Sequence, residues 1–264
     1  MLDKSYQKIA VFGGIYNNYL ALEEAIKSAK SNNVDQIFCL GDLGAFGPYP
    51  DRVFPLLIEN NIKVMQGNYD NSISNNIDNC QCGYTDPLDN YFAQISYEYT
   101  YKNTSEKYKL WMKELPEFIK IQLGKYKIHM SHGSPRQMNE FLWESATSEY
   151  FLKKLLNDYD CDILLATHTG IKWLKQIDDN YFINVGVLGR PENDGQTNVW
   201  YTILEIENND LKTKFIPVYY DYNRLAKEMK RENLPDEFIQ TILTGYWTTC
   251  LDILPVKERL KGKF

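Results

Sequence analysis

Four short motifs concentrate the residue types that bind divalent cations. They read GDLGAFGP at 41–48, GNYD at 67–70, HGSPR at 132–136 and THTG at 167–170. Carboxylate, amide and imidazole groups together suit Zn²⁺, iron or Mn²⁺ better than Ca²⁺. A fifth loop, in IAVFGGIY at 9–16, follows a similar apolar run but offers Gly14 and Tyr16, neither of which is a usual metal ligand. The motifs therefore indicate metal chemistry that is complete at some loops and deficient at one.

Short apolar strands alternating with longer helical patterns would position these motifs. The first third predicts a βαβαβ order, with strand 8–13, helix 19–32, strand 35–40, loop 41–50, helix 51–60 and strand 62–66. Right-handed crossovers then place the motif loops at the carboxyl ends of the strands, where open α/β sheets bind ligands. Residues 71–90 are polar and rich in Asn and Asp, and they predict a long loop or insertion.

The rest of the chain predicts a second sheet. We expect helices at 88–103 and 105–114, a hairpin turning at Gly124-Lys125, and a helix at about 146–157. Closely spaced strands follow at 162–167, 171–177, 181–186, 200–207 and 212–220. From Asp221 onward the chain reads as two short helices, broken at Leu234-Pro235, and an extended end. This order predicts an α/β fold of two packed mixed sheets flanked by helices, in four α-β-β-α layers, with one domain over 1–245 and a C-terminal tail at 246–264.

The order of the motifs resembles the calcineurin-like metallophosphoesterases, whose pattern runs D-x-H, GD, GN-H-D, H and G-H-x-H. The resemblance implies the same four-layer fold and a pair of cations that hydrolyse phosphoesters. It assigns Asp42, Asn68, His132 and His168 as the ligands of the second cation. The chain has three histidines, and two of them fall on these positions, each after an apolar strand. We therefore expect one divalent metal ion, with Mn, Fe or Zn as the alternatives.

The positions that would hold the first cation are mostly lost. The resemblance places Gly14, Tyr16 and Gly170 where the family has Asp, His and His, so that only the bridging Asp42 remains. Because the losses fall on one cation and spare the other, they indicate either a single-metal protein or an abandoned reaction with a retained structural cation.

Tyr69 occupies the position where most family members carry a catalytic histidine. A tyrosine with an ordinary pKa near 10 is a weaker acid at neutral pH. Some branches of the family read GNYD and continue with a segment like HGSPRQMNEFLWE at 132–144, so Tyr69 is a candidate catalytic residue of such a branch. A packing aromatic is the alternative.

Three further residues are candidates for binding a substrate. Asn18 matches an Asn often found in the family, and Arg136 and Arg190 could each present a bidentate fork to a phosphate. Structural or surface roles for the two arginines remain the alternative.

Composition excludes several classes of protein. With 264 residues, 44% apolar residues and a net charge of -6, the chain predicts a packed globule without a basic field for nucleic acid or an anionic membrane. It has no leader-like start and no run of roughly 18 apolar residues, which favours a cytoplasmic protein. Among the five cysteines, the Cys80-x-Cys82 pair could touch a metal, but we expect an incidental or structural role, and the odd count fits a reducing compartment.

Three hypotheses for function follow. The first is a metallophosphoesterase that keeps one metal site, acts on a phosphoester or another phosphate-containing small molecule, and has weak or lost hydrolysis. The second is a catalytically silent scaffold whose apolar C-terminal tail binds a protein partner or a second copy of the chain. The third is a protein that binds phosphate or nucleotide without hydrolysing it.

Overall fold

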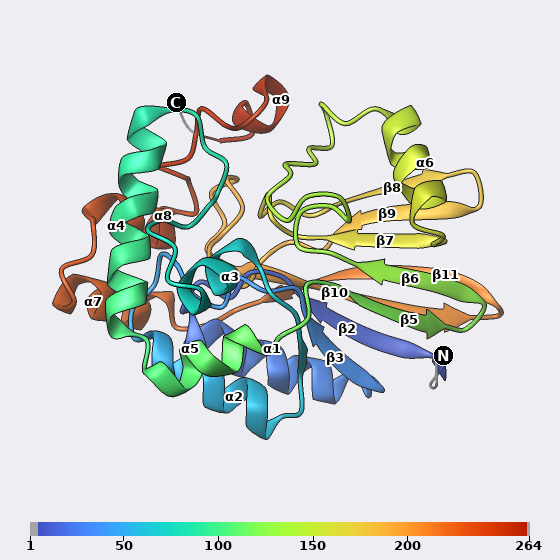
Figure 1. Cartoon of the computed structure of the whole chain (residues 1–264), viewed down its shortest axis with the longest axis horizontal. Coiled ribbons are helices and arrows are strands. Elements are labelled where there is room, and N and C mark those ends of the chain that lie inside the picture. The colour runs from blue at the N-terminus through green and yellow to red at the C-terminus, as the bar shows by residue number, and fades with distance from the viewer. Residues whose placement is uncertain (1–4, 263–264) are drawn as a thin grey trace.

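Two mixed β-sheets packed face to face form the centre of the molecule (Figure 1). The computed structural model describes residues 5–262. The five-stranded sheet has the order β11-β10-β2-β3-β4, and the six-stranded sheet has the order β1-β5-β6-β7-β9-β8. The strands are β1 (Ser5–Tyr6), β2 (Lys8–Phe12), β3 (Gln36–Cys39), β4 (Lys63–Val64), β5 (Ile119–Leu123), β6 (Tyr126–Met130), β7 (Ile163–Ala166), β8 (Trp173–Ile177), β9 (Asn180–Asn184), β10 (Val199–Glu207) and β11 (Asp210–Val218).

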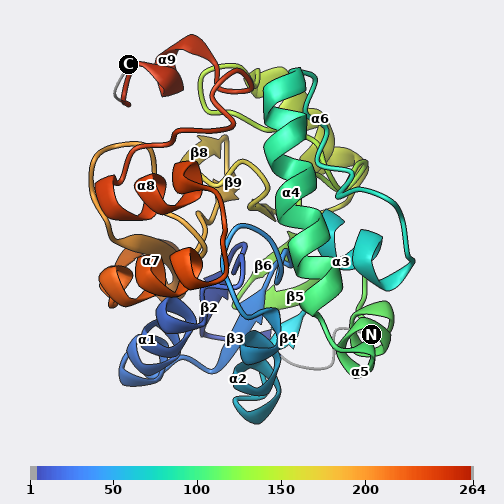
Figure 2. The same ribbon diagram turned by 90° about the vertical axis from the view of Figure 1, so that its left-hand side faces the viewer.

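Helices cover the outer faces of the sheets and the end of the molecule where the motif loops lie. They are α1 (Tyr19–Ser31), the short 3-10 helix η1 (Pro50–Arg52), α2 (Val53–Glu59), α3 (Asn68–Ser74), α4 (Pro87–Asn103), α5 (Glu106–Lys113), α6 (Glu149–Asp158), α7 (Tyr222–Arg231), α8 (Asp236–Thr244) and α9 (Val256–Arg259). Figure 2 shows α4 on one side of this end and α7 with α8 on the other.

Apolar alternation along the strands explains the layers. In β2, Ile9 and Val11 join the core between the two sheets, whereas Ala10 and Phe12 join the core under α1 and α2. Leu164 of β7 similarly faces a third core against α6. Because side chains alternate between the faces of a strand, a strand that is apolar at every position is buried on both faces. The predicted two-sheet fold with flanking helices is therefore confirmed.

Two details of the predicted fold are wrong. The strands near 200–207 and 212–220 do not belong to the second sheet, because β10 pairs antiparallel with β2 and extends the first sheet. Residues 71–90 are not one long loop, because α3 begins at Asn68 and α4 at Pro87. Propensity could not show the first helix, since Asn and Ser are poor interior helix formers and tertiary packing decides such short segments.

The C-terminal segment packs against its own chain. Trp247 donates its backbone N–H to Asn193 Oδ1 at 2.8 Å and its indole N–H to the Pro191 carbonyl at 2.7 Å. The Cys250 N–H donates to Asp89 Oδ1 at 2.7 Å. The segment expected to be extended also contains the short helix α9. Within the described residues 5–262, no helix combines the length and apolar character that a membrane span requires.

Candidate metal centre

Two glycines let the loops that carry Asp42 and Asn68 touch. Gly41 has φ +85°, and a Cβ on it would lie 2.0 Å from the Gly67 nitrogen. A Cβ on Gly67 would lie 2.3 Å from Asp42 Oδ1. Any side chain at either position would push the loops apart, which is the physical reason for glycine in both GD and GN. The loops after β3 and β4 thus meet beyond the carboxyl ends of their strands.

His132 and His168 approach Asp42 from the other sheet. They follow β6 and β7, whose arrowheads in Figure 1 point toward the end where α3 and α4 lie. His132 Nε2 lies 3.2 Å from Asp42 Oδ2, and the two imidazole centroids are 5.1 Å apart. One potential ligand atom from each of the three residues lies within 4.8 Å of the others. The structure therefore brings Asp42, His132 and His168 together, as the sequence predicts.

Hydrogen bonds to backbone carbonyls fix the tautomer of both imidazoles. His132 Nδ1–H donates to the Leu40 carbonyl at 2.7 Å, which leaves a lone pair on Nε2. His168 Nε2–H donates to the Cys82 carbonyl at 3.2 Å, which leaves a lone pair on Nδ1. Among the described residues, His168 Nδ1 has no hydrogen-bond partner, whereas His132 Nε2 faces the Asp42 carboxylate at 3.2 Å. A carbonyl that holds one ring N–H in this way is how proteins orient metal-binding histidines.

Asn68 completes the ligand group in the same manner. Its Nδ2 donates to the Cys80 carbonyl at 2.8 Å, so that Oδ1 is left buried and without a partner in the described chain. Buried polar atoms without partners are costly and rare. One nitrogen each of His132 and His168 lies beside the Asp42 carboxylate, and Asn68 belongs to the loop that touches Asp42, so a divalent cation bound there would satisfy these acceptors. The residues present therefore fit a single cation, and we call Asp42, Asn68, His132 and His168 the ligand half of the site.

The ionisation of these groups agrees with an anionic Asp42. Burial raises the pKa of Asp42, but the adjacent His132 and His168 rings and the Tyr69 N–H outweigh it and lower that pKa. Burial opposes the charged form of His132, whereas the charge of Asp42 raises its pKa. Burial, with His132 close by, lowers the pKa of His168 to about 3. His168 is thus neutral at physiological pH, as a ligand must be.

Asp70, the last residue of the GNYD motif, lies at the site, although the sequence did not predict a role for it. Its carboxylate accepts the N–H groups of Asp42 at 2.7 Å, Leu43 at 3.0 Å and Gly67 at 2.8 Å. Burial and the nearby charge of Asp42 raise its pKa to about 7. Asp70 joins the GD loop to the GN loop. The signal that could have revealed it is an Asp two residues after the proposed ligand Asn68.

The other half of the site is filled by an aromatic ring. A Cβ on Gly14 would lie 2.4 Å from Tyr16 Cε1, and a Cβ on Gly189 would lie 2.2 Å from Tyr16 Cδ2. The Tyr16 ring is buried between these two glycines. Gly170 has φ +77°, a conformation that disfavours a β-substituted residue. We call Gly14, Tyr16 and Gly170 the Tyr16 half of the site. The Tyr16 ring occupies the space of this half. The sequence shows that the ligand residues are missing, but it does not show that a ring fills their place.

A small cavity connects the two halves. Its volume is about 50 Å³, and its walls include Tyr16, Asp42, Tyr69, His168, Arg190 and Cys250. Sites for organic ligands usually have a volume of about 300 to 1,000 Å³. This cavity has room for a cation and a few water molecules. Phe238 of α8 and Thr249 of the C-terminal segment help to close it.

Tyr69 and Arg190 both line this cavity, as a catalytic residue and a substrate-binding residue would have to. The Tyr69 hydroxyl donates to Ser96 Oγ at 3.1 Å and to the Ala93 carbonyl at 3.4 Å, and burial raises its pKa further above the ordinary value. The guanidinium of Arg190 lies 3.6 Å from the centroid of the Trp247 ring, and its Nε has no partner among residues 5–262. Burial opposes the charged form of Arg190, whereas the neighbouring Cys250, which also hydrogen-bonds to it, and Tyr84 raise its pKa.

Asn18 and Arg136 lie in different surroundings. Asn18 Oδ1 accepts the Ala21 N–H and caps α1, while its Nδ2 donates to the Leu188 carbonyl at 3.1 Å. Both ends of this amide are therefore engaged within the protein. Arg136 is not among the residues that line the cavity, because its guanidinium pairs with Glu140. The structure brings Arg190 to the site but not Arg136, and a role for Arg136 in binding substrate stays a prediction.

Comparison with known proteins identifies the family. Residues 8–209 match the calcineurin-like phosphoesterase superfamily domain, and the chain belongs to this family. It is 25% identical over 252 residues to an uncharacterized protein of Methanocaldococcus jannaschii, covering 90% of this chain and 98% of that one.

Two solved structures share the fold. A hypothetical protein of Pyrococcus horikoshii has a TM-score of 0.73 and 20% identity, covering 91% of this chain and 99% of its own. A metallophosphoesterase of Sphaerobacter thermophilus has a TM-score of 0.70 and 22% identity, covering 91% of this chain and 100% of its own. At these identities the similarity establishes the fold and not the activity.

Proposed function

We propose that this protein binds one divalent cation through the ligand half of its site and acts weakly, or no longer, as a phosphoesterase. The observation that carries the proposal is the convergence of the His132 and His168 rings on the Asp42 carboxylate, together with buried, unpartnered acceptors on His168 and Asn68. Three backbone carbonyls hold these side chains in the orientation that frees the acceptor atoms. Buried polar atoms without partners also occur elsewhere, as in His129, but the His132 and His168 nitrogens converge on one carboxylate.

The same site would take a phosphate group as its substrate. When bound, the cation polarises a phosphoryl oxygen and lowers the pKa of a bound water molecule. Arg190 supplies a buried positive charge on the wall of the same cavity, and a phosphoryl anion would compensate it. Asp42 would bind the cation, and Asp70 would keep the Asp42 loop in register with Asn68.

Two features argue for weak or lost hydrolysis. The Tyr16 ring packs against Gly14, in the half of the site where the family pattern would place the first cation. In addition, the Tyr69 hydroxyl is already hydrogen-bonded to Ser96 and the Ala93 carbonyl, so it would have to break these bonds to protonate a leaving group. A single cation can still bind and polarise a phosphate, but it lacks the bridged hydroxide of a two-metal site.

Elemental analysis and activity assays test this proposal together. We expect one equivalent of Mn, Fe or Zn per chain, and slow metal-dependent turnover of an aryl phosphodiester or none. Asp42→Ala and His132→Ala should each abolish cation binding, whereas His129→Phe should not. Two equivalents per chain, or none after loading with each metal, would refute the single-site proposal.

A catalytically silent scaffold, or a binder of phosphate or nucleotide, is the second candidate. The observation in its favour is the small volume of the cavity, about 50 Å³, which is too little to hold a large phosphoester. In the C-terminal segment, Val256 and Leu260 remain exposed and would be the contact points for a protein partner or a second copy of the chain. A thermal shift with inorganic phosphate that requires the metal and is absent in EDTA would favour the phosphate binder over the scaffold.

A further inference from the structure

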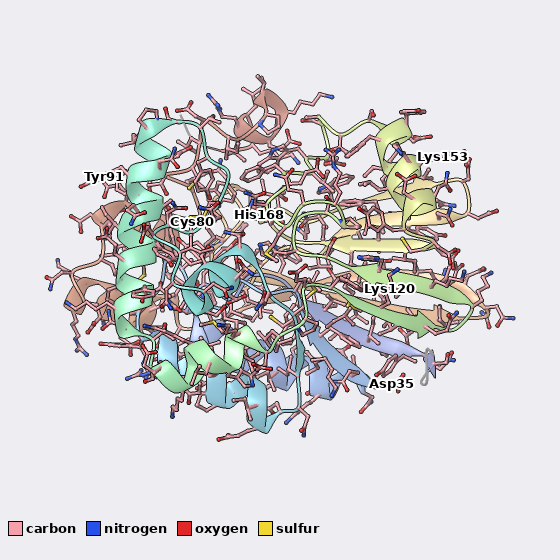
Figure 3. All side chains as sticks on the ribbon, in the orientation of Figure 1. Asp35, Cys80, Tyr91, Lys120, Lys153 and His168 are labelled. Carbon is pink, nitrogen blue, oxygen red and sulfur yellow. A yellow bond between two sulfur atoms is a disulfide. The ribbon has the colours of Figure 1, made fainter. Side chains whose placement is uncertain are left out.

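A disulfide joins Cys80 and Cys82 in the loop between α3 and α4, next to the ligand half of the site. The sequence predicts an incidental or structural role for this pair. The two cysteines line a surface groove together with Gln81, Asn90 and Tyr91. Cys82 also lines the internal cavity that contains Asp42 and His168. Figure 3 shows Cys80 between Tyr91 and His168. The disulfide thus separates the solvent-facing groove from the metal centre.

The same loop orients two of the proposed cation ligands. The Cys80 carbonyl accepts Asn68 Nδ2–H at 2.8 Å, and the Cys82 carbonyl accepts His168 Nε2–H at 3.2 Å. Cys82 Sγ lies 3.4 Å from Asn68 Nδ2 as well. The residue between the cysteines, Gln81, is exposed and has φ +52°, which a non-glycine residue adopts at a cost unless its surroundings hold it. The disulfide closes a small ring around Gln81 that contains the Cys80 carbonyl carbon, so it restrains the Cys80 carbonyl directly and the Cys82 carbonyl through the Cys82 Cα.

We infer that Cys80 and Cys82 form a reversible thiol–disulfide site that controls cation affinity. This inference rests on the cation site proposed above. In the disulfide form, the two carbonyls hold Asn68 and His168 with their acceptor atoms free for the cation. In the dithiol form, the ring is open, Gln81 relaxes from its left-handed conformation, and the two ligands lose their fixed orientation.

The partner in this exchange is a dithiol reductant, and the groove over the disulfide is where it would approach. A thiolate of the reductant attacks one cysteine sulfur, the Cys80–Cys82 bond breaks, and a mixed disulfide forms. The second thiol of the reductant then displaces the protein thiol. The reductant leaves as a cyclic disulfide, and its two electrons and two protons reside on the thiols of Cys80 and Cys82. A disulfide oxidant reverses the reaction.

The expected size of the effect follows from other metal sites. Loss of a hydrogen-bonding group that orients a metal ligand typically lowers affinity by about 10- to 100-fold. Two ligands are affected here, so we expect Mn²⁺ to bind at least about 10-fold more weakly to the dithiol form. A change of this size exceeds the scatter of a calorimetric titration.

The experiment titrates the full-length protein with Mn²⁺ in each redox state. One sample is oxidised, and the other is reduced with dithiothreitol and freed from it by anaerobic gel filtration. Thiol counting with mass spectrometry verifies that only Cys80 and Cys82 change state. Cys80→Ser/Cys82→Ser should bind Mn²⁺ like the reduced wild type in both states. Cys161→Ala, which alters a free cysteine of the core against α6, should keep the full redox response.

A second measurement separates this inference from the proposed function. In metal-free protein, reduction should shift the NMR signals of the Asn68 side-chain amide and the His168 ring, because both donate to the loop. Equal Mn²⁺ affinity in the two states, tighter binding after reduction, or no disulfide in any redox buffer would overturn the inference while leaving the cation site intact. If neither state binds Mn²⁺, the titration is repeated with Fe²⁺ and Zn²⁺. Absence of binding of all three metals in both states would refute the proposed function and, with it, control of cation affinity, and the NMR shifts would then report only whether the loop orients Asn68 and His168.

Discussion

The two halves of the site differ in how their space is used. In the ligand half, side chains are held by backbone carbonyls so that acceptor atoms of Asn68, His132 and His168 stay free. In the Tyr16 half, an aromatic ring packs against Gly14 and Gly189 and leaves no such room. The same sheets support both halves. The comparison teaches that a fold can keep one binding position organised while ordinary apolar packing takes over its neighbour.

Restoring a carboxylate in the Tyr16 half should give the largest effect. Gly14→Asp places a Cβ 2.4 Å from Tyr16 Cε1, so we expect a loss of about 3 to 5 kcal/mol in the free energy of unfolding from overpacking and a buried charge. Urea denaturation measures this loss. The double variant Gly14→Asp/Tyr16→Ala should have a free energy of unfolding at least about 1 kcal/mol higher than the sum of the two single effects predicts. Strict additivity of the two substitutions would show that the ring does not fill this half.

Crowding the ligand half should affect both stability and cation binding. In Gly67→Ala, the new methyl group would lie 2.3 Å from Asp42 Oδ1 and 2.9 Å from His132 Cε1. We expect destabilisation by about 2 to 3 kcal/mol and a loss of cation affinity of about 100-fold or more. Denaturation and calorimetry measure the two effects.

Gly170→Ala is the matched control in the Tyr16 half. Gly170, unlike Gly67, has a positive φ, and its Cβ would meet nothing closer than 3.7 Å. This variant should lose about 1 kcal/mol of stability through backbone strain and keep its cation affinity. Equal loss of affinity in both glycine variants would remove the distinction between the halves.

Removal of the cation should destabilise the protein by a predictable amount. A ligand present at 100 times its Kd stabilises the folded state by about 2.7 kcal/mol. We therefore expect a chelator to lower Tm by several degrees in the wild type and to have no effect in Asp42→Ala. Differential scanning calorimetry with and without EDTA measures this. A chelator effect that persists in Asp42→Ala would place the cation elsewhere.

A prediction that does not involve the cation site concerns His129, the histidine outside it. Its ring is buried between Phe118 and Tyr159, and both ring nitrogens lack partners in the described residues. Burial, and then the charge of Lys120, lowers its pKa to about 4 from the usual 6.5. Since the unfolded chain binds the proton more readily, the stability that neutral His129 contributes is complete above pH 6.5 and is lost as pH falls toward 4.

His129→Phe should therefore lessen the loss of stability between pH 6.5 and 4 by about 1 to 2 kcal/mol. Urea denaturation as a function of pH measures the slope. Cation affinity should not change, because a single unpartnered histidine without converging acceptors is not a metal site. A variant with weakened Mn²⁺ binding would contradict this contrast between His129 and the ligand half.

Sequence alone determined the fold class and the gathering of Asp42, Asn68, His132 and His168. Each of these residues follows an apolar strand or the Gly of a motif, and such loops meet at the carboxyl ends of parallel strands. Arg190 could also be found from its Gly-Arg-Pro turn. Asp70 could be noticed from its place two residues after Asn68, but its contacts could not be predicted, because backbone N–H groups carry no signature in residue type.

Only the tertiary structure decided what occupies the Tyr16 half. The ring fits because Gly14 and Gly189, far apart in the sequence, approach it from two sides, and no local pattern encodes such a contact. The placement of β10 beside β2 is likewise nonlocal. The contacts by which the Cys80 and Cys82 carbonyls orient Asn68 and His168 are nonlocal as well. Residue types and periodicity specify strands and loops, whereas close packing between distant segments determines which space stays open for a ligand.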